Sequence, residues 1–282
     1  MTYNNAASSR VKQILDQIEK DHDVEVLYAI ESGSRAWDFA SQNSDYDVRF
    51  IYREPAIRAF KLYPDRDVIE VMEQLSNHPD SVPVDVVGWS LAKALRLGLG
   101  SNPQFAEWSH IHTVYRVDPV FHHQMNEIAS HSAPRVLAHH YRGLAKKTYH
   151  EYLNRDEDPV GKKYLYAIRP IMASLWMLQN PIIGVSPPVI FGDLRREVIV
   201  PDVINDEITT LLTWKMAQDE ERGRRRFPQL DAWIAESIDE LGVAVGKIPE
   251  HLIDPEVVER IWIANYPEIF RQVSEPGSPS FT

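Results

Sequence analysis

Two aspartates separated by one residue, Asp45 and Asp47, open a segment of β-forming residues that runs to Tyr52. Successive side chains of a strand point to opposite faces, so both carboxylates are expected on the same face. Carboxylates held this close repel each other unless a cation lies between them. Hard divalent cations such as Mg²⁺ prefer oxygen ligands of this kind. The pair therefore indicates a site for a divalent cation.

A glycine and a serine, Gly33 and Ser34, lie upstream of the acidic pair, with ten residues between. They closely follow residues 24–30, an apolar run that is typical of a buried strand. Glycine lets the backbone approach an anion closely, and a serine hydroxyl can donate to phosphate oxygens. This order of features predicts a phosphate-binding turn beside the cation site. The alternative is an ordinary turn followed by a solvated strand edge.

A third carboxylate is expected from a neighbouring strand if two metal ions are to be held. Asp85 is the best candidate, because the surrounding residues 82–87 are otherwise apolar and an unpaired buried carboxylate is costly. The alternative is that Asp85 pairs with an arginine or caps a turn. Asp67 and Glu70 are weaker candidates for the same role.

Several cations could bind a phosphate chain. Arg49 falls on the same strand face as the acidic pair, where it would either steady a triphosphate or act as the counter-ion of the carboxylates. In the C-terminal half, the residues at helical spacing are Lys162, Lys163, Tyr166 and Arg169. Such a helix face would clasp a triphosphate or stack a base. The alternative is a solvated helix surface.

Two other polar clusters are ambiguous or weak. The basic run at residues 222–226 would hold an RNA backbone, or would only complement the dipole of a helix C-terminus. The histidine pairs 122–123 and 139–140 lack the i, i+4 spacing with glutamate that a zinc protease needs. We therefore do not expect these histidines to bind metal.

Composition limits the class of protein. The chain has 282 residues, 44% of them hydrophobic and 25% charged, as in globular proteins. The absence of cysteine excludes disulfides, thiolate zinc sites and cysteine nucleophiles. No apolar run is long enough for a membrane span or a signal peptide, so we expect a cytoplasmic protein with no membrane partner. The net charge of −11 argues against broad, sequence-blind nucleic-acid binding.

The apolar pattern predicts an N-terminal α/β part followed by a helical part. Strands are predicted at 24–30, 45–52 and 82–89, helices at 11–18 (capped by serines 8 and 9) and 91–99, and either type at 67–75. Helices are then predicted at 135–152, 161–179, 206–222 and 230–243, with Pro170 kinking or starting a helix. We expect domains at 1–125 and 126–274, with a boundary near 117–134, and a flexible tail at 275–282.

The elements Gly33-Ser34, Asp45-x-Asp47 and Asp85 resemble the signature of the nucleotidyltransferase superfamily that includes DNA polymerase β. More narrowly, the run GSRAWDFASQNSDYDVRFIY resembles a bacterial and phage family of predicted nucleotidyltransferases associated with RNA repair. Some members of that family are linked to RNA ligases. The similarity extends to residues 84–108 and 161–177. One departure is Asp38, where glycine is expected, which would alter the lip of the site.

The resemblance implies an α+β fold, in which a small mixed sheet of the polymerase β palm type is followed by a helical domain that closes a nucleotide cleft. It implies two Mg²⁺ or Mn²⁺ ions held by Asp45, Asp47 and Asp85, with Asp85 also helping to deprotonate the acceptor. The residues expected to bind the NTP, which includes ATP, are Gly33, Ser34, Arg35, Arg49, Lys162, Lys163, Tyr166 and Arg169.

The reaction implied is transfer of a nucleoside monophosphate to a hydroxyl group, with release of diphosphate. The family association makes an RNA end the preferred acceptor, in RNA repair or tRNA modification, with a functional link to an RNA ligase. The acidic balance favours tRNA or another small structured RNA. The alternatives are nucleotidylation of a protein or small molecule, and a catalytically silent module that binds nucleotide or RNA.

Overall fold

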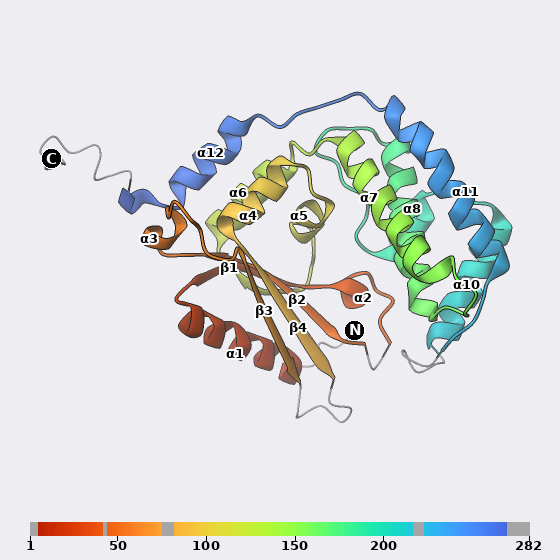
Figure 1. The fold of residues 1–282 in the computed structure, drawn as a ribbon, viewed down its shortest axis with the longest axis horizontal. Helices are drawn as coiled ribbons and strands as arrows, with labels where there is room; N and C mark the ends of the chain where they lie inside the picture. The colour runs from red at the N-terminus through yellow and green to blue at the C-terminus, as the bar shows by residue number, and fades with distance from the viewer. Residues whose placement is uncertain (1–4, 42–43, 75–81, 217–222, 270–282) are drawn as a thin grey trace, which may run out of the picture.

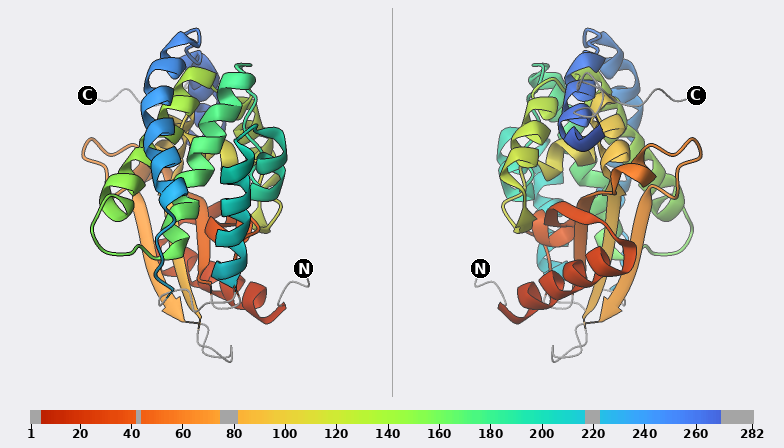
Figure 2. Two further views of the ribbon diagram at one scale, coloured as in Figure 1. Left: turned by 90° about the vertical axis from the view of Figure 1, so that its right-hand side faces the viewer. Right: turned by 90° about the vertical axis from the view of Figure 1, so that its left-hand side faces the viewer.

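The computed structural model describes residues 5–41, 44–74, 82–216 and 223–269. Figure 1 shows a β-sheet with helices on both faces and, beside it, a group of longer helices from the C-terminal half. The side views show the same arrangement, with the helical group packed next to the sheet (Figure 2). Within these residues, no helix combines the length and the apolar character that crossing a bilayer requires.

The sheet has five strands in the order β3-β4-β2-β1-β5. The strands are β1 Glu25–Ser32, β2 Tyr46–Arg53, β3 Val68–Gln74, β4 Pro83–Ser90 and β5 Val114–Val117. β2 and β4 pair in parallel, whereas the other neighbours pair antiparallel. The expectation of a mixed sheet is therefore confirmed, and the ambiguous segment at 67–75 forms the edge strand β3.

Two apolar layers cover the sheet. On one face α1 (Asn5–His22) packs Val11 and Leu15 against Val48 and Phe50 of β2. On the other face lie α4 (Leu91–Leu99), α5 (Pro103–Trp108) and α6 (Pro119–Ala129). Alternation along β2 leaves Asp47 and the residue two further on facing away from α1. The carboxylate pair of the sheet therefore lies on the face away from α1.

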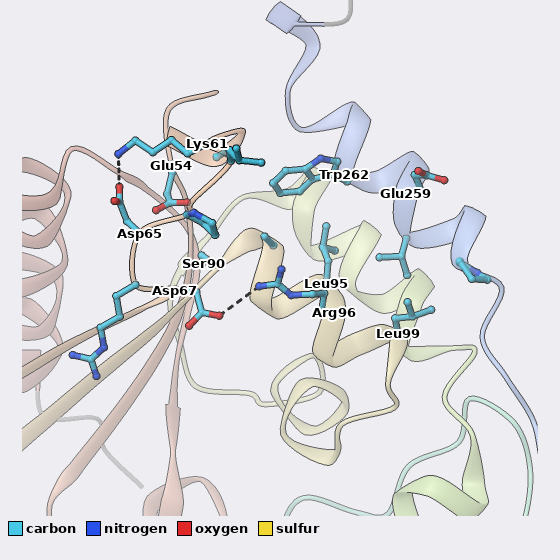
Figure 3. A pocket seen from close by; sticks show the side chains of 17 residues that line it. Glu54, Lys61, Asp65, Asp67, Ser90, Leu95, Arg96, Leu99, Glu259 and Trp262 are labelled. Atoms are coloured by element: carbon cyan, nitrogen blue, oxygen red, sulfur yellow. Dashed lines mark hydrogen bonds and ion pairs between the residues drawn. The ribbon is translucent and has the colours of Figure 1, made fainter. Parts of the chain in front are cut away.

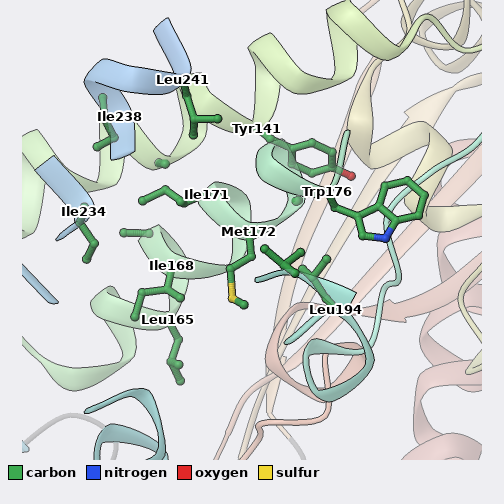
Figure 4. Close-up of a cluster of buried hydrophobic side chains, with 14 of the residues drawn as sticks. Tyr141, Leu165, Ile168, Ile171, Met172, Trp176, Leu194, Ile234, Ile238 and Leu241 are labelled. Atoms are coloured by element: carbon green, nitrogen blue, oxygen red, sulfur yellow. The ribbon is translucent and has the colours of Figure 1, made fainter. Parts of the chain in front are cut away.

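Two short helices follow β1 and β2, namely α2 (Gly33–Ala36) and α3 (Ala56–Ala59). The helical part then comprises α7 Pro134–Thr148, the π-helix η1 Tyr149–Leu153, α8 Gly161–Gln179, α9 Phe191–Glu197, α10 Asp202–Met216, α11 Pro228–Ala244, the 3₁₀ turn η2 Val245–Lys247 and α12 Pro255–Ala264. Figure 4 shows α8 side chains such as Ile168 and Met172 between those of α7 and α11. This apolar centre makes α8 the axis of the helical part.

The predicted helices and strands are present, some with the expected bounds and others with shifted ends. The helices at 91–99 and 161–179 have the bounds expected from the sequence. The serines at 8 and 9 do not cap the first helix, because α1 is already helical from Asn5. Pro170 starts no new helix and lies inside α8. The predicted helix at 206–222 ends at Met216 within the described residues, and its last six residues lie outside them.

Side chains of the two expected domains enter each other's cores. Phe39 and Ala106, from the N-terminal part, belong to the apolar cluster around α8. Conversely, α12 packs on α4 and α6, with Val258 and Ile261 in the cluster that covers the sheet. The division at residues 117–134 stays a prediction, and the expected tail at 275–282 lies outside the described residues.

Candidate active site

Parallel pairing of β2 with β4 places Asp47 directly opposite Asp85. Both side chains are partly open to solvent, with 23% and 33% of their surfaces exposed. Asp45 precedes the first residue of β2 and is exposed. Asp47 and Asp85, two of the three aspartates identified in the sequence, therefore lie side by side, and Asp45 lies just before the start of β2.

Burial raises the pKa of Asp47, and the negative charges of Asp85 and Asp45 add to the rise. The positive charges of Arg49 and Lys162 oppose it. All four of these groups are thus close enough to Asp47 to act on its charge. A cation at this position would be favoured because it would relieve the repulsion among the carboxylates.

Arg49 neutralises the carboxylate pair. Its Nη2 donates to Oδ2 of Asp85 at 2.8 Å and to Oδ1 of Asp47 at 3.2 Å. Its Nη1 donates to the backbone carbonyls of Val48 at 2.9 Å and Asp85 at 3.0 Å. Of the two roles that the sequence left open for Arg49, this arrangement is that of a counter-ion. The triphosphate role stays a prediction.

Gly33 packs its backbone against the carboxylate of Asp47. Ser32 pairs with Asp47 across β1 and β2, so the chain leaves β1 directly beside this side chain. Gly33 has a φ of +63°, and a Cβ at this position would lie 2.0 Å from Oδ2 of Asp47. Both the left-handed backbone and the lack of space require glycine here.

The turn after β1 is the short helix α2. The amide of Trp37 donates to the carbonyl of Gly33, and that of Phe39 donates to the carbonyl of Ser34, both at 3.1 Å. Ser34 itself is buried. Phosphate binding by Gly33 and Ser34 is untested by this geometry and stays a prediction.

Glu31, which the sequence analysis missed, lies beneath the site. This buried side chain accepts a hydrogen bond from the amide of Asp47 at 3.0 Å and another from the hydroxyl of Tyr115. Burial raises its pKa to about 7, although both hydrogen bonds oppose the rise. The signal was available, since an acidic residue at the end of an apolar strand needs a partner just as Asp85 does.

Arg35 braces the segment that leads into β2. Its Nε donates to the carbonyl of Asp45 at 3.1 Å, and its Nη2 donates to the carbonyl of Ser44 at 2.6 Å. The guanidinium also stacks 3.9 Å from the ring centroid of Tyr46. These contacts support the position of Asp45, so a nucleotide-binding role for Arg35 stays a prediction beside this structural one.

The start of α8 carries two lysines and an aromatic ring, and one of the lysines acts on the charge of Asp47. The positive charge of Lys162 opposes the rise in the pKa of Asp47, so this lysine lies within electrostatic range of the aspartate. The Nζ of Lys163 lies 3.8 Å from the ring centroid of Tyr152 and 6.0 Å from that of Tyr166. Tyr166 in turn meets Trp37, next to α2, edge to face at 5.5 Å. A nucleotide-binding role for Lys162, Lys163 and Tyr166 stays a prediction.

Arg169, one further turn along α8, has a different environment. Its Nη1 donates to Oε1 of Glu107 at 3.0 Å, and both side chains are buried, at 4% and 9% exposure. Its guanidinium also lies 4.4 Å from the ring centroid of Trp37. These contacts give Arg169 a structural role in the core, and the nucleotide-binding role expected for it stays a prediction.

The other candidate residues have structural partners away from Asp47. Asp67 accepts from Lys93 at 3.1 Å and Arg96 at 3.4 Å, and Glu70 pairs with Arg66 at 2.8 Å. Asp67 and Arg96 line a pocket of about 780 Å³ between the α3 loop, α4 and α12 (Figure 3). This pocket lies at the far ends of β2 and β4 from the aspartates, because α4 begins where β4 ends.

The described part of the basic run, residues 223–226, lies in the segment before α11. Arg226 donates to the carbonyls of Leu153, Arg155 and Glu157 and to the carboxylate of Asp231. The contacts of Arg226 hold a loop against the end of η1, and both roles that the sequence left open for the basic run stay predictions. Arg222 lies outside the described residues.

The carboxylates suit a hard divalent cation in chemical type. No cluster of three or more acidic or histidine side chains is arranged around a metal position in residues 5–41, 44–74, 82–216 and 223–269. Within that part, Asp47 and Asp85 are adjacent and Arg49 takes the place of a metal charge. These donor atoms are of the type that binds such an ion, and the role of Asp45, Asp47 and Asp85 as metal ligands stays a prediction.

Residues 7–260 match the protein family described as RlaP, the RNA repair pathway DNA polymerase beta family. The chain therefore belongs to that family, and with it to the nucleotidyltransferase superfamily, as the motifs at Gly33-Ser34 and Asp45-x-Asp47 indicated. The mixed sheet followed by helices agrees with the fold class expected from that resemblance.

Similar individual proteins include one curated relative and one solved structure. The uncharacterized protein YcgL of Bacillus subtilis strain 168 is 34% identical over 233 residues, which is 82% of this chain and 85% of that protein. A crystal structure of a nucleotidyltransferase-like protein from Exiguobacterium sibiricum 255-15 aligns with 96% of this chain and 82% of its own, at 10% identity and a TM-score of 0.27. A similarity that distant transfers neither a site nor a function.

Proposed function

We propose that this protein is a metal-dependent nucleotidyltransferase that transfers a nucleoside monophosphate from an NTP to a hydroxyl group of a small structured RNA. The observation that carries the proposal is the pairing of Asp47 with Asp85 on parallel strands, with the backbone of Gly33 packed against Asp47. Membership of a polymerase β-type family connected with RNA repair supports it.

In the proposed reaction, the acceptor oxygen forms a bond to the α-phosphorus of the NTP while the bond from that phosphorus to the diphosphate oxygen breaks. Asp85 takes up the proton of the acceptor hydroxyl, and diphosphate leaves with the electron pair. Asp45, Asp47 and Asp85 would hold two Mg²⁺ or Mn²⁺ ions, which supply charge neutralisation at the phosphates when bound. Gly33 and Glu31 keep Asp47 in position through its carboxylate and its amide.

The start of α8 supplies the second wall of the proposed nucleotide site. Lys162, which acts electrostatically on Asp47, would contact the triphosphate. Lys163 and Tyr166, placed together with Trp37, would contact the base or the outer phosphates. Charge and stacking from this helix complement the carboxylates of the sheet, so the substrate would lie between the two parts of the molecule.

The acceptor proposed is a small RNA, because the net charge of −11 disfavours long contacts with a phosphate backbone. The test is incubation of the purified protein with Mg²⁺ and α-³²P-labelled NTPs, together with either tRNA or total protein. Label in RNA supports the proposal. Label in protein would instead support protein nucleotidylation, and label in neither would favour a silent binding module.

Replacing Asp47 tests the site within the same assay. Asp47→Ala should lower transfer by roughly 100-fold or more, because it removes a carboxylate that would hold the metal ion beside the reacting phosphate. The matched control is Asp67→Ala, an aspartate that pairs with Lys93 and Arg96 far from the site, and it should keep activity. Full transfer by a folded Asp47→Ala variant would contradict the assignment.

Lys163→Ala should mainly weaken binding of the nucleotide, because this ammonium group stands with Tyr166 at the proposed nucleotide wall. Loss of one charge-assisted contact corresponds to an increase of roughly tenfold in the apparent dissociation constant of the NTP. Lys146→Ala on the exposed surface of α7 is the matched control. Equal NTP affinity in the two variants, measured by isothermal titration calorimetry, would return Lys163 to a purely structural role.

A further inference from the structure

The guanidinium of Arg49 occupies the oxygens that a metal ion would need. A single nitrogen, Nη2, bridges Oδ1 of Asp47 and Oδ2 of Asp85 at 3.2 and 2.8 Å. Bonds between a charged donor and a charged acceptor are among the stronger hydrogen bonds of proteins. A divalent cation that binds these two carboxylates must therefore first take the place of Arg49.

The arrangement leaves room for such an exchange. The side chain of Arg49 is 19% exposed, and those of Asp47 and Asp85 are more exposed, so solvent reaches the pair. Nη1 donates to the carbonyls of Val48 and Asp85, and because the guanidinium is rigid, a cation that displaces Arg49 must break these hydrogen bonds as well. Lys162 is a second positive charge that acts on Asp47, and it adds to the barrier against a lone cation.

We propose that Arg49 is a built-in competitor of the divalent cation and makes metal binding depend on the nucleotide. This inference rests on the proposed function. A cation alone must displace Arg49 into solvent and therefore binds weakly. When an NTP is present, its triphosphate offers the released guanidinium a new anionic partner, so that cation and nucleotide bind with positive coupling. Without a nucleotide, Arg49 keeps the carboxylates neutralised.

The proposal makes two predictions of opposite sign for one residue. Replacing Arg49 should tighten cation binding in the absence of nucleotide, because the competitor is gone. The same replacement should weaken binding of the NTP, because the triphosphate loses its partner. Replacing a residue that only stabilises the fold would not tighten binding of one ligand while weakening binding of the other.

The test measures Mn²⁺ binding by electron paramagnetic resonance, with and without a non-hydrolysable NTP, in the wild type, Arg49→Met and Arg49→Lys. Without nucleotide, Arg49→Met should bind Mn²⁺ about tenfold more tightly than the wild type, since one charge-assisted contact no longer competes. Arg49→Lys should fall between them. Addition of the NTP analogue should tighten Mn²⁺ binding strongly in the wild type and little in Arg49→Met.

Arg53→Met is the matched control, because it removes the same charge from the same strand at an ion pair with Glu25. It should bind Mn²⁺ as the wild type does. Circular dichroism confirms that each variant is folded, and Arg49→Lys retains a cation if Arg49→Met does not fold. Equal Mn²⁺ affinity in the wild type and the folded Arg49 variants would overturn the competition while leaving the proposed function intact. Absence of Mn²⁺ binding in every protein, even with the NTP analogue, would overturn the proposed function as well.

Discussion

Glu31 shows how a single buried carboxylate can support the site without belonging to the motif. It accepts hydrogen bonds from the amide of Asp47 on β2 and from the hydroxyl of Tyr115 on β5, and these two strands flank β1 in the sheet. Hydrogen bonds to a buried group fix its rotamer and, through it, the backbone that it contacts. We therefore regard Glu31 as a positioning residue for Asp47.

The raised pKa of Glu31, about 7 against an ordinary value of 4.5, makes stability depend on pH. Between these two values the folded protein binds a proton that the unfolded chain has released, so the free energy of unfolding falls as pH rises through this window. The loss approaches about 3 kcal/mol above pH 7. Glu31→Gln should remove that dependence, as measured by urea denaturation at pH 5 and pH 8.

The control for this measurement is Glu70→Gln, which changes an exposed glutamate of the same sheet. It should keep the wild-type difference in unfolding free energy between the two pH values. If Glu31→Gln also kept that difference, the titration would belong to another group, and the account of Glu31 would be wrong.

At the scale of elements, the junction between β1 and α2 decides where the carboxylate of Asp47 lies. The strand ends opposite Asp47, and the chain then turns through the left-handed conformation of Gly33. Glycine is required at this position because it adopts this φ without strain and because a Cβ would lie only 2.0 Å from Oδ2 of Asp47. Gly33 was expected to let a phosphate come close to the backbone; in the structure it lets the carboxylate of Asp47 do so.

Gly33→Ala should therefore lower transfer activity at least about tenfold and destabilise the fold by roughly 1–3 kcal/mol, from backbone strain and the displaced carboxylate. The matched control is Gly143→Ala in α7, where an added Cβ meets nothing within 4 Å. That change should raise stability by roughly 0.5–1 kcal/mol through helix propensity. Thermal denaturation and the transfer assay give both results, and an active, stable Gly33→Ala variant would contradict the account.

At the scale of the whole molecule, a buried ion pair joins the sheet part to the helical part. Glu107 of α5 accepts from Arg169 of α8 at 3.0 Å and from the hydroxyl of Tyr141 in α7 at 2.8 Å. Nearby, the buried Nζ of Lys215 donates to the carbonyl of Phe39 at 2.8 Å. These contacts hold the two walls of the proposed nucleotide site at one separation.

Removing one partner of a buried pair leaves an uncompensated charge, so Arg169→Met should destabilise the protein by about 3–5 kcal/mol. The double variant with Glu107→Gln should recover part of that loss. The exposed Arg196→Met, which removes a pair with Asp193, is the control and should stay within about 0.5 kcal/mol. Urea denaturation measures the three values. A variant at Arg169 that kept full stability but lost NTP affinity would instead support the nucleotide-binding role.

Local periodicity and charge were enough to predict several features of the site and the fold. Alternation placed Asp47 and Arg49 on one strand face, and the apolar run around Asp85 marked a carboxylate that needs a partner. Helical spacing gave the bounds of α8 and α4 because long amphipathic patterns depend on near neighbours alone. The family was indicated by the same short motifs.

The partners of these residues depend on long-range packing and could not be predicted from local patterns. The pairing of Asp47 with Asp85 needed the parallel register of β2 and β4, and the support from Glu31 needed Tyr115 on β5. The same holds for Arg169, whose helical spacing with Lys162 and Tyr166 gave no sign of a buried glutamate 62 residues away. Contacts between residues distant in sequence arise when separate apolar faces pack together, and local patterns carry no record of that packing.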